Sequence, residues 1–259
     1  MTHARKRASR RGHPGAVVVA GRRPVAVALR AGLATEVLVS RTARTTEGLR
    51  ELLAEAERGG IAVARIGASE IERLAGDTTH QGVVARTTPP RELGEADLAQ
   101  RDWPSDAIVL ALDGVTDPHN LGAAARTADA AGAAALVIRR HRGAGLGAIA
   151  VKASAGALLL LPVARVANIA RALGRLKEAG FWVVGLDDSA AATIATPRPS
   201  GRLALVVGSE GEGLSRLVGE ACDEVLAIPM RGRVASLNVS VAAAVGLYAY
   251  ALREPEKQE

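Results

Sequence analysis

Apolar and polar positions in the first third of the chain alternate with two periods, one that matches a strand and one that matches a helix. Short apolar runs predict strands at three places, 36–39, 61–64 and 82–85. Pro24 opens one helical stretch, and apolar residues recur at helical spacing over 49–56. Ser69 and Glu72 have the spacing of a capping box, which predicts that a third helix starts at Ser69. The pattern predicts a small α/β layered unit over residues 15–88.

The second half of the chain predicts a largely parallel sheet. Apolar runs, typical of strands buried on both faces, occur at five places, 108–112, 135–138, 182–185, 203–207 and 225–228. Helical stretches such as 120–131 and 168–178 lie between them. Because strand and helix alternate throughout, residues 106–253 are expected to form an α/β domain with parallel strands.

The segments outside these two units differ in composition. Residues 89–105 hold Pro89, Pro90 and several charges without a sustained apolar period, which predicts a linker. Residues 254–259 form a short polar tail. Of 33 Lys and Arg residues, five lie in the first 13 positions, so the remaining chain is nearly neutral with 28 against 27 acids. Residues 1–14 are expected to be a disordered basic tail, either a solvated leader or an arm that binds phosphates.

Composition excludes several classes of protein. Hydrophobic residues make up 48% of the chain and aromatic residues 2%, which excludes a disordered chain and leaves little for a base-stacking platform. Cys222 is the one cysteine, and the five histidines lack zinc-ligand spacing, so we expect no disulfide and no metal. No apolar run approaches the roughly 20 residues of a membrane span, and no signal-peptide pattern follows the basic start. These features favour a cytoplasmic protein.

Three loops that follow predicted strands hold candidate site residues, because ligands of open α/β sheets gather at the carboxyl ends of strands. The first loop lies within residues 113–128, after the predicted strand at 108–112. There Asn120 can cap the following helix, and Arg126 lies on that helix. A helix N-terminus with an arginine suits an anion such as an RNA phosphate. The alternative is that Asn120 is only a cap and Arg126 only a surface residue.

The other two loops follow the predicted strands at 203–207 and 225–228. In 207–214, three glycines allow a ligand to approach the backbone, and Glu210 lies at the strand end. The alternative for this loop is a flexible turn with Glu210 in solvent. In 228–240, Ser236 and Asn238 precede the last helix, and capping is the alternative for both.

The three loops occur together and in order, and in this the chain resembles the SpoU branch of the SPOUT RNA methyltransferases. Residues 117–122 with Arg126 resemble the first family motif, 208–211 the second and 236–242 the third. Residues 22–32, with His80-Gln81-Gly82, are similar to the family's N-terminal RNA-binding domain, which has an L30e-like fold. The resemblance implies a parallel-sheet catalytic domain with a C-terminal trefoil knot, and a homodimer.

The resemblance also implies the reaction. S-adenosylmethionine would donate a methyl group to a ribose 2′-hydroxyl of RNA, with a guanosine in the peptidyl-transferase P-loop of 23S ribosomal RNA as the expected target. The alternatives are the same chemistry on tRNA or on another ribosomal site, and a non-catalytic rRNA-binding protein. A Rossmann oxidoreductase is disfavoured, because the pattern G-x-G-x-x-G occurs nowhere in the chain.

Site residues follow from the same resemblance. It implies a cofactor site lined by six residues, Val207, Gly208, Ile228, Met230, Ser236 and Leu237. It implies that the catalytic residues are Asn120, Arg126, Glu210, Ser236 and Asn238. The family's proposed base matches Arg126, but a guanidinium with a pKa above about 12 resists deprotonation. We therefore expect Arg126 to bind an RNA phosphate, and Glu210 to accept a proton or to order a partner. The three remaining residues, Asn120, Ser236 and Asn238, are expected to hold the ribose and the loop by hydrogen bonds.

Overall fold

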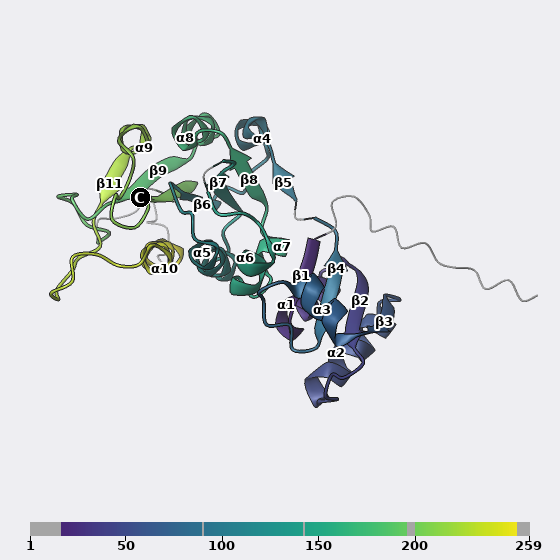
Figure 1. Ribbon diagram of the computed structural model, residues 1–259. Coiled ribbons are helices and arrows are strands. Elements are labelled where there is room, and N and C mark those ends of the chain that lie inside the picture. The colour runs from purple at the N-terminus through teal and green to yellow at the C-terminus, as the bar shows by residue number, and fades with distance from the viewer. Residues whose placement is uncertain (1–16, 90, 142, 196–199, 253–259) are drawn as a thin grey trace, which may run out of the picture.

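The computed structural model describes residues 17–89, 91–141, 143–195 and 200–252, which fold into two α/β units (Figure 1). In the first unit the sheet order is β1-β4-β2-β3, with β4 antiparallel to both neighbours and β2 parallel to β3. Its strands are β1 (Val17–Ala20), β2 (Ala34–Ser40), β3 (Ala62–Ile66) and β4 (Val83–Thr87). Its helices are α1 (Arg22–Arg30), α2 (Glu47–Arg58) and α3 (Ala68–Ala75). The predicted strands and helices are confirmed, and β1 is an addition.

Helices cover both faces of this first sheet. Leu52 of α2 packs in the same apolar cluster as Val37 of β2 and Val25 of α1. Ile71 of α3 packs instead with Leu38, the next residue along β2. Because successive side chains of a strand point to opposite faces, α1 and α2 lie on one side of the sheet and α3 on the other.

The start of α3 differs from the prediction. Its N-cap is Gly67, which has no side chain to accept a hydrogen bond, and Ser69 lies inside the first turn. The predicted capping box is therefore wrong, since a serine caps only from the position before the helix. Glu70 also lies in this first turn, where a negative charge is favourable to the helix dipole.

The second unit has a seven-stranded sheet of order β11-β9-β10-β6-β7-β8-β5, and all of its described strand pairs are parallel. The strands are β5 (Glu92–Leu93), β6 (Ile108–Leu112), β7 (Ala135–Arg139), β8 (Val163–Val166), β9 (Trp182–Leu186), β10 (Leu203–Val207) and β11 (Glu224–Leu226). The helices are α4 (Glu95–Gln100), α5 (Pro118–Ala130), α6 (Ala148–Ala153), α7 (Ala157–Leu160), α8 (Ile169–Glu178), α9 (Arg216–Ala221) and α10 (Val239–Ala251). The parallel sheet that the sequence predicts is confirmed.

Two helical layers enclose this sheet. Helices α5, α6, α7 and α10 lie on one side of it, and α4, α8 and α9 lie on the other (Figure 1). The central strand β6 divides its side chains accordingly, with Leu110 facing the first layer and Val109 the second. Every residue of β6 is buried, as expected of a strand covered on both faces.

The predicted linker needs correction, because most of residues 89–105 belong to the second unit. β5 extends the parallel sheet, and Leu93, Leu98 and Trp103 are buried in its core. The indole of Trp103 donates a hydrogen bond to the carbonyl of Leu98 (3.0 Å) and packs edge-on against Phe181. These anchors recur every five residues, which matches neither a strand nor a helix, so periodicity alone did not reveal them. The predicted tails, 1–14 and 254–259, lie outside the described residues.

Candidate active site

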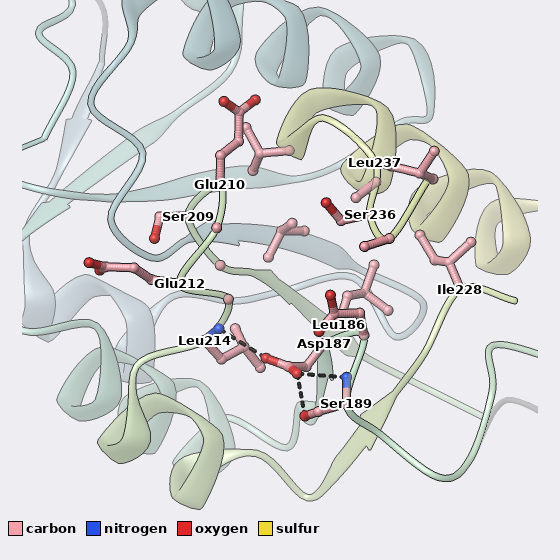
Figure 2. Close-up of a pocket in the computed structure, with 18 of the residues that line it drawn as sticks. Leu186, Asp187, Ser189, Ser209, Glu210, Glu212, Leu214, Ile228, Ser236 and Leu237 are labelled. Atoms are coloured by element: carbon pink, nitrogen blue, oxygen red, sulfur yellow. Dashed lines mark hydrogen bonds between the residues drawn. The ribbon is translucent and has the colours of Figure 1, made fainter. Parts of the chain in front are cut away.

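A cavity of about 450 Å³ opens at the carboxyl ends of β9, β10 and β11, beside the start of α10 (Figure 2). Its walls come from residues 186–189, 207–214, Ile228, Met230, 235–237, Val239 and Ala242. It is lined by all six predicted cofactor-binding residues, Val207, Gly208, Ile228, Met230, Ser236 and Leu237. The cavity lies at the carboxyl ends of parallel strands, where ligands of open α/β sheets gather.

The glycine-rich loop after β10 is a tight hairpin and not a flexible turn. Ser209 and Gly213 exchange backbone hydrogen bonds of 3.1 Å in both directions. Gly208 faces this pair so closely that a Cβ atom on it would lie 2.1 Å from the carbonyl carbon of Gly213. Any side chain at 208 would force the hairpin open, so glycine is required by close approach of two backbone segments.

The loop after β9 contributes an aspartate that the sequence analysis did not single out. Asp187 Oδ2 accepts the backbone N–H of Leu214 (3.1 Å), and Oδ1 accepts the N–H (3.0 Å) and hydroxyl (2.5 Å) of Ser189 (Figure 2). Burial opposes the charge, but these hydrogen bonds outweigh it and lower the pKa of Asp187. Its position directly after a predicted strand, followed by Asp188 and Ser189, was the signal available.

A second carboxylate holds the same loop from the other side. Asp113, at the end of β6, is 2% exposed, and its Oδ2 accepts the backbone N–H of Ser215 (2.9 Å). Its Oδ1 accepts a hydrogen bond from the guanidinium of Arg139 (2.8 Å), so the buried charge is paired. Asp113 and Asp187 thus fix adjacent backbone amides at the carboxyl end of the glycine-rich loop.

Three of the predicted catalytic residues meet at the rim of the cavity, and we call Asn120, Glu210 and Asn238 the rim trio. Asn120 Nδ2 donates to Glu210 Oε1 (3.2 Å), and Asn238 Nδ2 donates to Asn120 Oδ1 (3.0 Å) and to Glu210 Oε1. Glu210 also lines the cavity. Segments 90 and 28 residues apart along the chain therefore converge on one carboxylate.

Local helix structure explains how the two asparagines reach Glu210. The N-cap of α5 is Asp117, whose side chain accepts the N–H of His119 (2.9 Å), so the capping role expected for Asn120 is wrong. Asn238 is the N-cap of α10 and accepts the N–H of Ser240 (3.0 Å), while its amide NH₂ remains available to the trio. For Asn238 the capping interpretation is confirmed, and it does not compete with the predicted site role, since the two ends of one amide can serve each separately.

The remaining two predicted catalytic residues lie apart from the trio. Ser236 lines the cavity from the loop before α10. Arg126 is exposed on α5, without a hydrogen bond or ion pair to any described residue. Six residues separate it from Asn120, which is about 9 Å along the helix and about 120° around it. The structure therefore joins Asn120, Glu210 and Asn238 directly and leaves Arg126 facing solvent.

Metal ligands, membrane-spanning helices and the cysteine were the remaining features to consider in the part of the chain that the structure describes. No three His, Cys, Asp or Glu side chains there gather as metal ligands. Nor does any of its helices combine the length and apolar character of a bilayer span. Cys222 is a free, half-buried cysteine, and burial raises the pKa of its thiol to about 11.

Comparison with known proteins gives the class to which this fold and site belong. The SpoU rRNA Methylase family matches residues 107–248, and the family described as RNA 2'-O ribose methyltransferase substrate binding matches residues 18–93. The chain belongs to the SpoU rRNA methylase family. The expected family membership is confirmed, and the second match coincides with the first α/β unit.

Individual relatives narrow the comparison. The protein named 23S rRNA (guanosine-2'-O-)-methyltransferase RlmB from Pasteurella multocida is 45% identical over 207 residues, covering 79% of this chain and 84% of the relative. The protein of the same name from Escherichia coli K12 is 43% identical over 209 residues, covering 79% and 85%. Among solved structures, the SpoU methyltransferase AviRb from Streptomyces viridochromogenes in complex with AdoMet matches with TM-score 0.75 and 27% identity, covering 92% and 90%.

Proposed function

We propose that this protein transfers a methyl group from S-adenosylmethionine to the ribose 2′-hydroxyl of a guanosine in 23S ribosomal RNA. The observation that carries the proposal is Glu210, which lines the cavity and also binds Asn120 and Asn238 at its rim. A donor in the cavity and an RNA ribose at the rim would both contact this group. The target is taken from the names of the 43–45% identical relatives, and the P-loop guanosine is the position we expect.

The charges of the cavity suit this donor. Four carboxylates line it, those of Asp187, Asp188, Glu210 and Glu212, and no lysine, arginine or histidine among the described residues lines it. S-adenosylmethionine carries a sulfonium and an ammonium cation, whereas a dinucleotide carries an anionic pyrophosphate. The acidic lining therefore favours the methyl donor over NAD, although the protein as a whole has net charge +6. The volume is also within the range of small-molecule sites.

The residues of the chain have distinct parts in the proposed mechanism. Bound S-adenosylmethionine supplies an electrophilic methyl group. Val207, Gly208 and Leu237 would hold the donor, and Ser236 would hold both donor and ribose. Because the methyl transfer neutralises a positive charge, in-line placement of the reacting atoms is the main requirement and no metal is needed.

The ribose 2′-hydroxyl must lose its proton as it attacks, so a positioned base is required. We assign this part to Glu210, whose carboxylate is oriented by the amides of Asn120 and Asn238. Arg126 would bind an RNA phosphate, because its exposed guanidinium has no carboxylate partner among the described residues.

We also propose a cytoplasmic homodimer, assembled through α10. This helix contains no charged residue, and it exposes Val241 (46%) and Tyr248 (40%), with Leu252 (76%) exposed at its C-cap. A second copy covering these side chains would remove them from water. We propose in addition that residues 15–88 form an L30e-like RNA-binding domain and that residues 106–253 form a SPOUT domain with a trefoil knot. Light scattering on the purified protein, with Tyr248→Asp as the dimer-breaking variant, tests the assembly.

Ligand binding and RNA mapping test the proposed reaction. At about 100 times its dissociation constant, S-adenosylmethionine should stabilise the fold by roughly 2.7 kcal/mol, and NAD should not. In a strain that lacks the gene, 2′-O-methyl mapping should find one lost mark, at the P-loop guanosine of 23S rRNA. A mark lost from tRNA instead would keep the chemistry and change the target, whereas an unchanged methylation profile would contradict the proposal.

A further inference from the structure

One glycine lies where the first and second units meet, and a second glycine permits close contact within the second unit. Gly156, in the turn between α6 and α7, has φ +99°, and a Cβ there would lie 2.9 Å from Cβ and Cγ1 of Val27 on α1. Gly122 on α5 lies so near α6 that a Cβ there would come within 2.4 Å of the Ala153 Cβ. At both positions, the glycine backbone packs directly against the neighbouring helix, which leaves no free space into which the packed elements could shift.

Hydrogen bonds within the α6–α7 hairpin hold the turn that carries Gly156. Ser154 is 1% exposed, and its hydroxyl donates to the carbonyl of Val151 (2.8 Å) and accepts the N–H of Leu158 (3.2 Å). The N–H of Gly156 also binds the Val151 carbonyl (3.0 Å). These bonds tie the two short helices together across their turn, so the hairpin would move as one piece.

The covalent connection between the units is short. The N–H of Thr88 binds the carbonyl of Leu33 in the first unit (2.9 Å), and the carbonyl of Arg91 accepts the N–H of Val163 in the second (3.1 Å). In the sequence, only Pro89 and Pro90 separate these anchored residues. The two anchored residues, Thr88 and Arg91, are therefore three positions apart along the chain. An apolar cluster shared by both units adds to the contact.

The same contacts lead to the candidate active site. Val27 of the first unit lies against Gly156, Ser154 ties that turn to α6, and α6 lies against Gly122. Gly122 is two residues beyond Asn120 on α5, and Asn120 binds Glu210. The RNA-binding unit is therefore packed, without an intervening flexible element, onto the helix that carries one member of the rim trio.

We propose that the contact between Gly156 and Val27 is a positioning contact that holds the RNA-binding unit in one orientation relative to α5, and so determines which ribose of a bound RNA reaches the rim. This inference rests on the proposed function, because it concerns where that RNA is placed. Gly156 and Val27 are positioning residues here, since neither contacts the cavity.

The test adds a single methyl group at the contact. Gly156→Ala should lower the single-turnover methylation rate at saturating RNA and S-adenosylmethionine by about tenfold or more, since small displacements of reacting groups are costly. The dissociation constants of RNA and of S-adenosylmethionine should each stay within about twofold, because neither binding surface is changed. A merely structural role would lower binding and rate together.

Gly132→Ala is the matched control, because Gly132 also has positive φ (+76°) but has nothing within 4 Å of its Cβ position. It carries the same backbone strain without the collision, and its rate should match that of the unaltered protein. Equal rates for the two variants would overturn the positioning contact. If Gly156→Ala does not fold, the single-turnover methylation rate of Val27→Ala provides the test. This variant leaves a gap at the contact without backbone strain, and an unchanged rate overturns the proposal. Failure of the unaltered protein to methylate RNA would instead refute the proposed function.

Discussion

The wall and the rim of the cavity are held in different ways. At the wall, backbone amides of Leu214 and Ser215 bind the carboxylates of Asp187 and Asp113, and Gly208 packs against backbone. At the rim, the exposed side chains of the trio bind mainly one another. A wall built on backbone keeps one shape, whereas rim side chains can exchange partners with an incoming ribose.

This difference implies that donor binding and methyl transfer can be separated by mutation. Changes at the wall should alter affinity for the donor, and changes at the rim or on α5 should alter the rate while the donor still binds. Four variants test the separation.

Arg126→Ala should have the largest effect, a loss of methylation on the order of a thousandfold, as expected when a charged group that binds the phosphate beside the reacting ribose is removed. Its side chain has no partner among the described residues, so the fold and the affinity for S-adenosylmethionine should be retained. Single-turnover kinetics and calorimetry measure the two quantities. Arg175→Ala, an exposed arginine on α8 paired with Glu178, is the control and should be active. If Arg126→Ala loses both S-adenosylmethionine binding and methylation, Arg126 has a structural role instead.

Glu210→Gln should lower the methylation rate on the order of a hundredfold, the lower range for loss of a general base. The amide keeps an oxygen that can accept hydrogen bonds from Asn120 and Asn238, so the trio should stay assembled. Rates measured across pH distinguish a lost proton acceptor from a lost contact. An unchanged rate would exclude Glu210 as the base and leave it as an orienting group.

Gly208→Ala should weaken binding of S-adenosylmethionine by about tenfold or more, because the added Cβ would overlap Gly213 and overpacking costs about 1–3 kcal/mol. Gly219→Ala is the control, since Gly219 lies on α9 outside the cavity lining and has nothing within 4 Å of its Cβ position. Calorimetric titration of both variants measures the difference. If they bind the donor equally, the hairpin does not shape the wall.

Asp187→Asn should lower the melting temperature by about 2–4 °C at neutral pH, the smallest of the four effects. The folded-state pKa of Asp187 lies below the ordinary value of 3.8, so its stabilising contribution is present above that value and is lost as pH falls through the folded pKa. The difference between the two proteins should therefore shrink below pH 3.8. Melting curves from pH 7 to 3 follow it, and a constant difference would show that the charge of Asp187 is irrelevant.

Sequence patterns located most of the cavity because the rule behind them is topological. Parallel strands place their carboxyl ends at one edge, so the loops after the two predicted strands that end at Val207 and Ile228 had to lie at the same edge of the sheet, and the strand order β11-β9-β10 brings them together. Asp113 and Asp187 were missed although they follow predicted strands, because an aspartate at a strand end is common in loops and gains meaning only from the amides it binds. Periodicity failed again at 89–105, where three widely spaced anchors belong to the core.

By itself, the sequence determined most of the strands and helices, that the main sheet is parallel, and which three loops hold candidate site residues. These depend on local periodicity and residue type, which are properties of neighbours along the chain. Only the tertiary structure decided that Asn120 binds Glu210 instead of capping α5, that Arg126 is exposed and bonds to no described residue, and that the two units pack through Gly156. Those outcomes depend on distances between residues far apart in the chain, and such distances are set by packing of the whole fold.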